Sequence, residues 1–191
     1  ANSERQLEHH HGQDYGSGTA DDGKRVIRGC QQLFRLFYTG THEVADRRDP
    51  IFVGKGMLRQ YYYKNGKDVT EHFSYEGCIV MCIESFLKQV PTRLIVETLE
   101  PSIIYLFPRD MIQKLARENW EINMFYQKIL EYSLIVSQVK ADSWRFESAR
   151  ERYNLLLETH PEIIKRAPLA HIASYLLMTP ETLSRVRSGV L

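Results

Sequence analysis

The chain has 191 residues, of which 43 % are hydrophobic and 26 % charged, and its formal net charge is +1. No apolar run approaches the roughly 20 residues of a membrane helix, and no secretory signal pattern is recognisable, so we expect no membrane partner. Such a small net charge excludes nucleic-acid binding through bulk charge, so any basic surface must be local. The three cysteines are too few for a disulfide framework, which favours a reducing, cytoplasmic environment.

The first 25 residues are polar and rich in glycine, serine and aspartate, without hydrophobic periodicity. Segments of this composition cannot bury enough apolar surface to order themselves, so residues 1–25 are predicted to be a disordered tail. The run His9 to His11 within this tail is more typical of a tail than of a metal site.

Residues 26–107 are predicted to form a β-domain, and its clearest element is a hairpin. Asn65 and Gly66 are a strong two-residue turn signal, because both turn positions need positive φ. Further strands are predicted at residues 51–56, 78–86, 93–99 and 102–108. The glycines and prolines between these segments favour an antiparallel sandwich or barrel over a parallel sheet.

Residues 108–145 are predicted to form two helices, the second of them long. Apolar residues recur along the second helix in steps of three and four: Ile122, Phe125, Ile129, Tyr132, Val136 and Val139. This stripe predicts a homodimer interface, since an a/d repeat is typical of paired helices. Leu130, Leu134 and Ile135 lie off the stripe, so the helix is apolar on two sides and one of them can cover the β-domain. The alternative is a plain amphipathic helix that faces the core.

Residues 146–191 are predicted to be helical, and residues 168–187 match a helix-turn-helix template. The apolar or small places of the template hold Ile172, Ala173, Leu176, Met178, Leu183 and Val186. Leu177 occupies the turn position usually given to glycine. A left-handed backbone there would cost leucine about 1–2 kcal/mol, and the alternative is a slightly different turn that accepts leucine. The alternative is an ordinary helical hairpin.

The second helix of this template has a well-defined start and a polar face. Thr179 is a good N-cap, Pro180 is favoured in the first turn, and Glu181 suits the positive end of the helix dipole. The predicted DNA-binding residues are Thr179, Glu181, Thr182, Ser184, Arg185 and Arg187. Side chains of these types can reach base edges and phosphates in a major groove, which predicts double-stranded DNA as the partner.

The order of β-domain, long helix and helix-turn-helix resembles the Crp/Fnr family of bacterial transcription regulators. The motifs that carry the resemblance are IFVGKGMLRQYY, YEGCIVMCIESFL and TPETLSRVR, and it spans roughly residues 26–191. It implies an α+β fold in which a double-stranded β-helix, or jelly roll, of the cyclic-nucleotide-binding type senses a small molecule. It also implies a parallel homodimer through the long helix and two recognition helices that read a palindromic operator.

The resemblance assigns recognition positions to Glu181, Thr182 and Arg185. Glu181 and Arg185 match polar base readers of the family, whereas Pro180 stands where its best-known members have an arginine. One guanine contact is therefore missing, and the operator is expected to differ. The segment before the helix pair is short and helical in pattern, so the family's β-hairpin wing has no counterpart in the sequence.

The effector-pocket candidates Glu84, Thr92 and Arg93 depart from the family's pattern. Glu84 is the candidate counterpart of the ribose-binding glutamate, but Pro91-Thr92 stands where cyclic-nucleotide binders have Arg-Ser or Arg-Thr. Arg93 comes one residue late, and one residue along a strand reverses the direction of a side chain. We therefore expect no binding of cyclic AMP, and an unknown small-molecule effector stays open. Cys78 and Cys82 have only Cys30 as a companion, which is too few for an iron–sulfur ligand set, so no such cofactor is expected.

Two classes of function remain open from the sequence. The first is a DNA-binding transcription regulator with a degenerate or altered sensor domain. The second is a cupin-like small-molecule-binding protein whose helical C-terminus binds a protein partner. An enzymatic cupin needs clustered metal ligands, but the β-domain offers His42 and His72 without His-x-His spacing, so no enzyme and no metal site are predicted. The helix-turn-helix match favours the first class.

Overall fold

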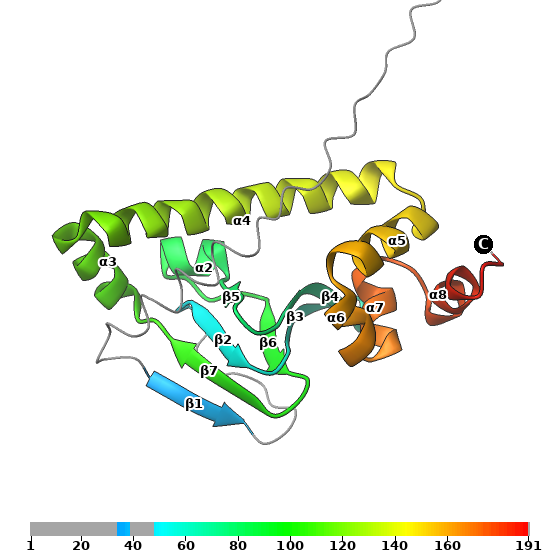
Figure 1. Ribbon diagram of the computed structural model, residues 1–191, viewed down its shortest axis with the longest axis horizontal. Helices are drawn as coiled ribbons and strands as arrows, with labels where there is room; N and C mark the ends of the chain where they lie inside the picture. The colour runs from blue at the N-terminus through cyan, green and yellow to red at the C-terminus, as the bar shows by residue number, and fades with distance from the viewer. Residues whose placement is uncertain (1–33, 39–47, 191) are drawn as a thin grey trace, which may run out of the picture.

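The computed structural model describes residues 48–190 and, as backbone, residues 34–38. The predicted tail at 1–25, together with Cys30 and His42, lies outside these residues. Figure 1 shows a β-domain, a long helix α4 that runs along it, and a group of short helices below the C-terminal end of α4. None of the helices in this described part combines the length and the apolar composition that crossing a bilayer requires.

The β-domain consists of two antiparallel sheets. The first has the strand order β1-β7-β2-β5, with β1 (Phe34–Tyr38), β2 (Ile51–Lys55), β5 (Ile79–Val80) and β7 (Ser102–Leu106). The second has the order β4-β3-β6, with β3 (Leu58–Lys64), β4 (Lys67–Ser74) and β6 (Ile95–Thr98). Both sheets contribute to one buried core of Ile51, Val53, Leu58, Val80, Val96 and Ile104. The predicted antiparallel arrangement is confirmed.

The hairpin of β3 and β4 has the predicted turn. Asn65 and Gly66 have φ values of 51° and 73°, so both turn positions are left-handed as this turn type requires. Because β4 pairs with β3 alone in its sheet, its other edge is open to contact from elsewhere in the chain.

The strand predicted at residues 78–86 is wrong in its second half. The strand β5 ends at Val80, and the helix α2 (Ile83–Lys88) follows. This helix buries Ser85 and Phe86 on one face, and the Ser85 hydroxyl donates to the Val90 carbonyl at 2.6 Å. A short apolar run fits a buried strand and a buried helix turn equally well, so periodicity does not separate them.

Two helices follow β7: α3 (Arg109–Glu118) and α4 (Trp120–Phe146). Asn119 lies between them and its side chain accepts hydrogen bonds from two backbone amides in the first turn of α4. This cap separates the two helices and lets α4 start in a new direction. Although α4 has 27 residues, none of them is buried in the single chain.

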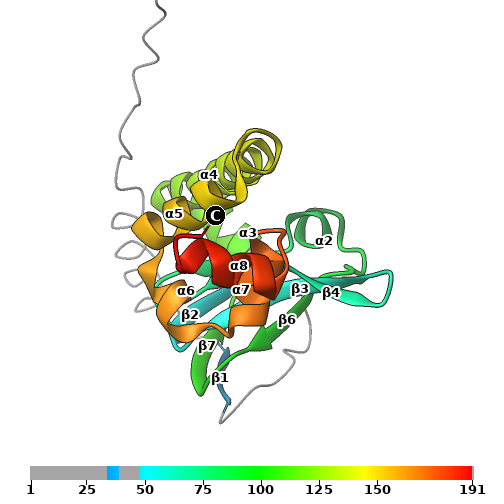
Figure 2. The same cartoon turned by 90° about the vertical axis from the view of Figure 1, so that its right-hand side faces the viewer.

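Four short helices form what we call the C-terminal helical unit: α5 (Ala149–Thr159), α6 (Pro161–Arg166), α7 (Leu169–Tyr175) and α8 (Pro180–Arg187). A capping box of Ser148 and Glu151 starts the unit two residues after α4 ends. Its buried core contains Leu156, Ile163, Ala167, Ile172, Ala173, Leu176 and Leu183. Figure 2 looks from the end at which α7 lies against β4.

Candidate functional site

The helices α7 and α8 are joined by a tight turn of four residues. Leu177 in this turn has φ of 53°, so the glycine position of the template has a left-handed backbone here. The turn is closed by the amide of Met178, which donates to the Ala173 carbonyl at 2.9 Å. Leucine at this position therefore carries the strain that the sequence analysis attached to it.

The template places of α7 and α8 face inward. Five of the six predicted apolar or small residues are buried, namely Ile172, Ala173, Leu176, Leu183 and Val186, and Met178 is half-buried. Ala173 is completely inaccessible, which fits a place that must be small because a second helix crosses it. This burial fixes the angle of α8 relative to α7 and decides which face of α8 is left outside.

The first turn of α8 is capped as predicted. The hydroxyl of Thr179 accepts a hydrogen bond from the Thr182 amide at 3.2 Å, and Pro180 occupies the first turn. Hydrogen bonds from the backbone amide of Glu181 and from the Thr179 side chain lower the pKa of the Glu181 carboxyl, so it is ionised at neutral pH. An anionic group here also suits the helix dipole.

The outer face of α8 carries the predicted polar residues. The exposed members of the predicted set are Thr179, Glu181, Ser184, Arg185 and Arg187, and Thr182 is half-buried. Glu181 and Arg185 are four residues apart and therefore share one side of the helix. In Figure 1, α8 lies at the end of the molecule that is far from β1 and β7, and among the residues that the structure describes none covers this face.

The chain between α5 and α7 is helical, as the sequence analysis expected. The helix α6 follows α5 after His160 alone, and within residues 146–190 the secondary structure consists of helices and turns. A β-hairpin wing is therefore not part of this described segment.

The three effector-pocket candidates do not converge on one site. Glu84 lies on α2 with 75 % of its side chain exposed, and Lys88 one turn later donates to its carboxylate at 2.9 Å. Thr92 accepts a hydrogen bond from the amide of Leu94 within the loop before β6. Arg93 is exposed in the same loop and precedes the strand. None of these three residues therefore supplies a buried cation that could receive a cyclic phosphate.

A buried polar cluster that the sequence analysis missed lies on β3. Arg59 is 3 % exposed and forms ion pairs with Asp68 at 2.7 Å and Glu97 at 2.6 Å. The neighbouring Gln60 is also buried, and its amide donates to the sulfur of Cys82 at 3.4 Å. A signal was present, since an arginine and a glutamine lie next to each other between a leucine and three tyrosines in the strand.

The predicted dimer stripe on α4 divides into two sets. Ile122, Phe125 and Ile129 line an apolar cavity between α3, α4 and the β-domain, together with Phe52, Ile79, Met81 and Phe86 among others. They therefore face the protein's own β-domain. Tyr132 and Val139 are exposed, as are the off-stripe residues Leu134 and Ile135, and Val136 is half-buried. Contact of any of these residues with a second copy stays a prediction.

Comparison with known proteins finds similar structures but no match to the sequence. No protein-family model and no curated protein matches the sequence. The structure is similar to FixK2 from Bradyrhizobium japonicum, at 20 % identity and a TM-score of 0.67, over 83 % of this chain and 84 % of that chain. It is also similar to the c-di-GMP-responsive global regulator CLP from Xanthomonas campestris, at 15 % identity and a TM-score of 0.67, over 88 % and 91 %.

A third similar structure is described as a transcriptional regulator of the Crp/Fnr family from Eubacterium rectale, at 13 % identity and a TM-score of 0.64, over 88 % of this chain and 82 % of that chain. The chain has the Crp/Fnr fold. In this fold a cyclic-nucleotide-binding type of β-domain precedes a helical C-terminal region, so the predicted fold class is confirmed.

Proposed function

We propose that the protein is a sequence-specific DNA-binding transcription regulator of Crp/Fnr type. The observation that carries the proposal is the construction of α8, which is capped at Thr179, buries Leu183 and Val186, and exposes a polar face. The similar structures reported above include a global regulator and a transcriptional regulator. In this proposal α7 and α8 are a helix-turn-helix, and α8 enters the major groove.

Arg185 is proposed to read a base and Arg187 to contact a phosphate. Arg185 lies one turn beyond Glu181 on the exposed face, whereas Arg187 is the last residue of α8. Base contacts discriminate between sequences by about 1–3 kcal/mol each, while a phosphate contact adds affinity that falls with salt. The two arginines thus have different roles in the proposed interface.

The functional unit is proposed to be a homodimer that binds a palindromic operator. Support comes from α4, which exposes Tyr132, Ile135, Val139 and Phe146 at spacings of three, four and seven residues. Such a seam is typical of helices that pair along their length. Two recognition helices related by a two-fold axis match two half-sites of opposite orientation.

The effector pocket is proposed to differ from that of cyclic-nucleotide binders. Pro91 and Thr92 hold the place of the phosphate-binding pair, Arg93 is exposed, and Glu84 pairs with Lys88 on the surface. A cyclic phosphate bound at these positions would therefore lack a buried guanidinium from Arg93 to offset its desolvation. The proposed regulator responds to another small molecule or acts without one.

Operator selection from a random DNA library tests the proposal. The parent chain is expected to enrich a two-fold symmetric sequence, and Arg185→Ala to relax the preference at one base pair in each half-site. Arg187→Ala is expected to weaken binding to all sequences alike and to reduce the salt dependence by about one counterion per subunit. Lys88→Ala, which removes an exposed charge from α2, serves as the control and should change neither. Failure of the parent to enrich any sequence would refute the proposed function.

A further inference from the structure

The C-terminal helical unit and the β-domain share one buried cluster. Met57, in the turn between β2 and β3, is fully buried among the core residues of the helical unit. Phe73 of β4 packs against Tyr175 of α7, with ring centroids 5.4 Å apart and an interplanar angle of 63°. The unit is therefore docked on the β-domain as well as connected to it through α4.

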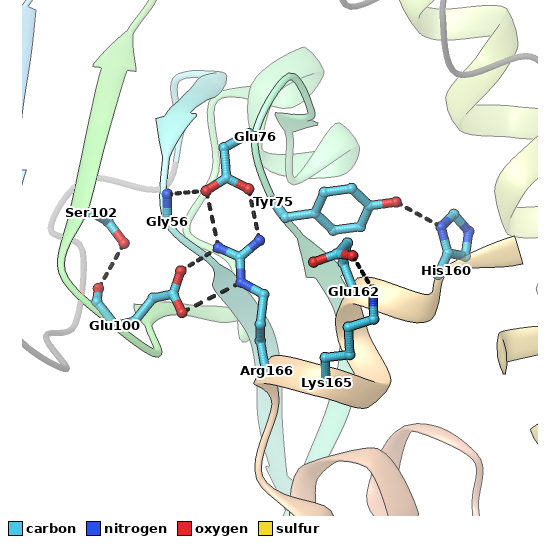
Figure 3. A network of polar contacts seen from close by, with 9 residues as sticks. All are labelled: Gly56, Tyr75, Glu76, Glu100, Ser102, His160, Glu162, Lys165 and Arg166. Atoms are coloured by element: carbon cyan, nitrogen blue, oxygen red, sulfur yellow. Dashed lines mark hydrogen bonds and ion pairs between the residues drawn. The ribbon is translucent and has the colours of Figure 1, made fainter.

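Arg166, the last residue of α6, ties the unit to the turns at one end of the β-domain (Figure 3). Its guanidinium forms a two-point ion pair with Glu76, at 2.8 Å and 3.0 Å, and a second ion pair with Glu100. Glu76 also accepts a hydrogen bond from the amide of Gly56 at 2.7 Å. One arginine thus joins the turns that precede β3, β5 and β7. We call Arg166, Glu76 and Glu100 the Arg166 cluster.

Two members of the Arg166 cluster, Arg166 and Glu76, are ionised throughout the neutral pH range. Burial opposes ionisation of Glu76, but hydrogen bonds from Arg166 and from backbone amides outweigh it and lower the pKa to about 2. Hydrogen bonds to Glu76 and then to Glu100 raise the pKa of Arg166. Bidentate pairing of this kind also fixes the direction of the arginine, because the planar fork matches the carboxylate.

A second contact gives the docked arrangement an atomic reporter. The hydroxyl of Ser174 on α7 accepts from the amide of Thr70 at 2.9 Å and donates to the carbonyl of Asp68 at 3.2 Å. Ser174 thereby covers the open edge of β4. The amide of Thr70 points to the helical unit, so its exchange with solvent depends on whether the unit is docked.

We propose that Arg166 is a positioning residue for DNA binding, whose ion pairs with Glu76 and Glu100 set the distance between the two recognition helices of the dimer. This inference rests on the proposed function. The chain between α4 and α5 is two residues long, Glu147 and Ser148, and both have extended backbone. Without the contacts to the β-domain, α8 turns about this junction and its distance from the dimer axis varies.

The docked arrangement presents the recognition helix instead of hiding it. Arg166 and the docked face of α7 lie on the side of the unit toward the β-domain, whereas Glu181, Arg185 and Arg187 on α8 are exposed. Docking therefore supports DNA binding in this proposal, because a fixed half-site distance requires no further ordering of the unit when DNA binds.

Two variants break the Arg166 cluster from opposite sides and with opposite changes in charge. Arg166→Met removes a positive charge from the helical unit, and Glu76→Gln with Glu100→Gln removes two negative charges from the β-domain. Charge alone would make the first variant bind DNA more weakly and the second more tightly. Lys165→Met is the matched control, because Lys165 is the neighbouring cation on α6 and pairs with Glu162 of the same helix at 2.8 Å.

The measurements are hydrogen exchange of the Thr70 amide without DNA and binding to operators whose half-sites are one to three base pairs closer or farther apart. Both variants that break the Arg166 cluster are expected to speed Thr70 exchange by about tenfold or more. In both variants the affinity for the operators is also expected to depend less on half-site spacing than in the parent, and to vary by no more than about threefold across the spacings tested. Lys165→Met should match the parent in both measurements.

Three results would overturn the inference. One is unchanged Thr70 exchange in both variants, and another is an unchanged spacing preference although exchange is faster. The third is tighter binding of the parent's operator by Arg166→Met, which would make docking inhibitory. Failure of the proposed function looks different, because then the parent itself selects no operator.

Discussion

Nη1 of Arg59 lies 2.6 Å from Nδ1 of His171, across the junction between β3 and α7. A guanidinium has donors alone, so the ring nitrogen must accept, and His171 is neutral with its proton on Nε2. The same guanidinium is held by Asp68 and Glu97 and lies 4.0 Å from the centroid of the Tyr61 ring. The docked helical unit therefore depends on an uncharged histidine beside a buried cation.

Acid is expected to loosen this docking. Burial, and then the charge of Arg59, hold the pKa of His171 below its ordinary 6.5, while Asp68 and Glu97 act in the opposite direction. A pKa that is lower in the docked state means that the contribution of neutral His171 is complete above pH 6.5 and declines as the pH falls further. We expect the free energy of unfolding to decrease below pH 6.5, by at most about 1.4 kcal/mol per pH unit for each such histidine.

Two more histidines have lowered pKa values and act in the same direction. Burial lowers the pKa of His160, whose Nδ1 lies 3.0 Å from the hydroxyl of Tyr75. Burial, and then Lys140, lower the pKa of His72 to about 3, and Glu71 lies 4.0 Å from its ring. Urea unfolding at pH 7.5 and pH 5.5 measures the sum. In His171→Asn, which keeps an acceptor near the position of Nδ1, the loss between the two pH values should be smaller. An equal loss would exclude His171 from the acid response.

Local features of this chain could be predicted from the sequence, and the docking could not. The turn at Asn65-Gly66 and the cap at Thr179 depend on residues within three positions of each other. The Thr70–Ser174 hydrogen bond instead joins residues 104 positions apart, and the identity of neither residue indicates that the other is its partner. The division of the α4 stripe into two sets could not be predicted for a related reason. The direction in which α4 leaves Asn119 decides which apolar side of the helix meets the β-domain, and the spacing of apolar residues gives no information about that direction.

Replacing Leu177 with glycine is expected to stabilise the protein. The φ of 53° strains leucine by about 1–2 kcal/mol, and glycine removes that strain at the expense of more freedom in the unfolded chain. About half of the leucine side chain is exposed, so little packing is lost. We expect a gain of up to about 1 kcal/mol in unfolding free energy, measured with urea. Leu177→Ala keeps the Cβ atom and should give no gain. Equal gains from both variants would show that the backbone strain is not the cause.

Replacing Gly56 with alanine is expected to destabilise the β-domain. Gly56 has φ of 96°, and a Cβ atom there would lie 2.1 Å from the Ser102 hydroxyl oxygen and 2.9 Å from Ser102 Cα. Strain and displacement together should lower the unfolding free energy by about 1–3 kcal/mol. Gly66→Ala is the control, since Gly66 has φ of 73° but nothing lies within 4 Å of the added atom. A loss in Gly56→Ala no larger than that in Gly66→Ala would contradict the role of Ser102.

Glutamate substitutions on the two apolar sides of α4 are expected to differ in their effects on dimerisation and stability. Ile135 and Val139 are 58 % and 55 % exposed and lie on the proposed seam, so Ile135→Glu with Val139→Glu should give a folded monomer in sedimentation equilibrium. Ile129 lines the apolar cavity against the β-domain, so Ile129→Glu buries an unpaired carboxylate and should lower the unfolding free energy by several kcal/mol. Ser137→Glu adds a charge at an exposed position outside the seam and should leave a stable dimer. The opposite result would be a dimeric Ile135→Glu/Val139→Glu variant together with a folded, monomeric Ile129→Glu variant. That result would place the dimer interface on the side of α4 that carries Ile129 and faces the β-domain. The proposed seam would then be wrong, and the cavity would be where the second copy contacts α4.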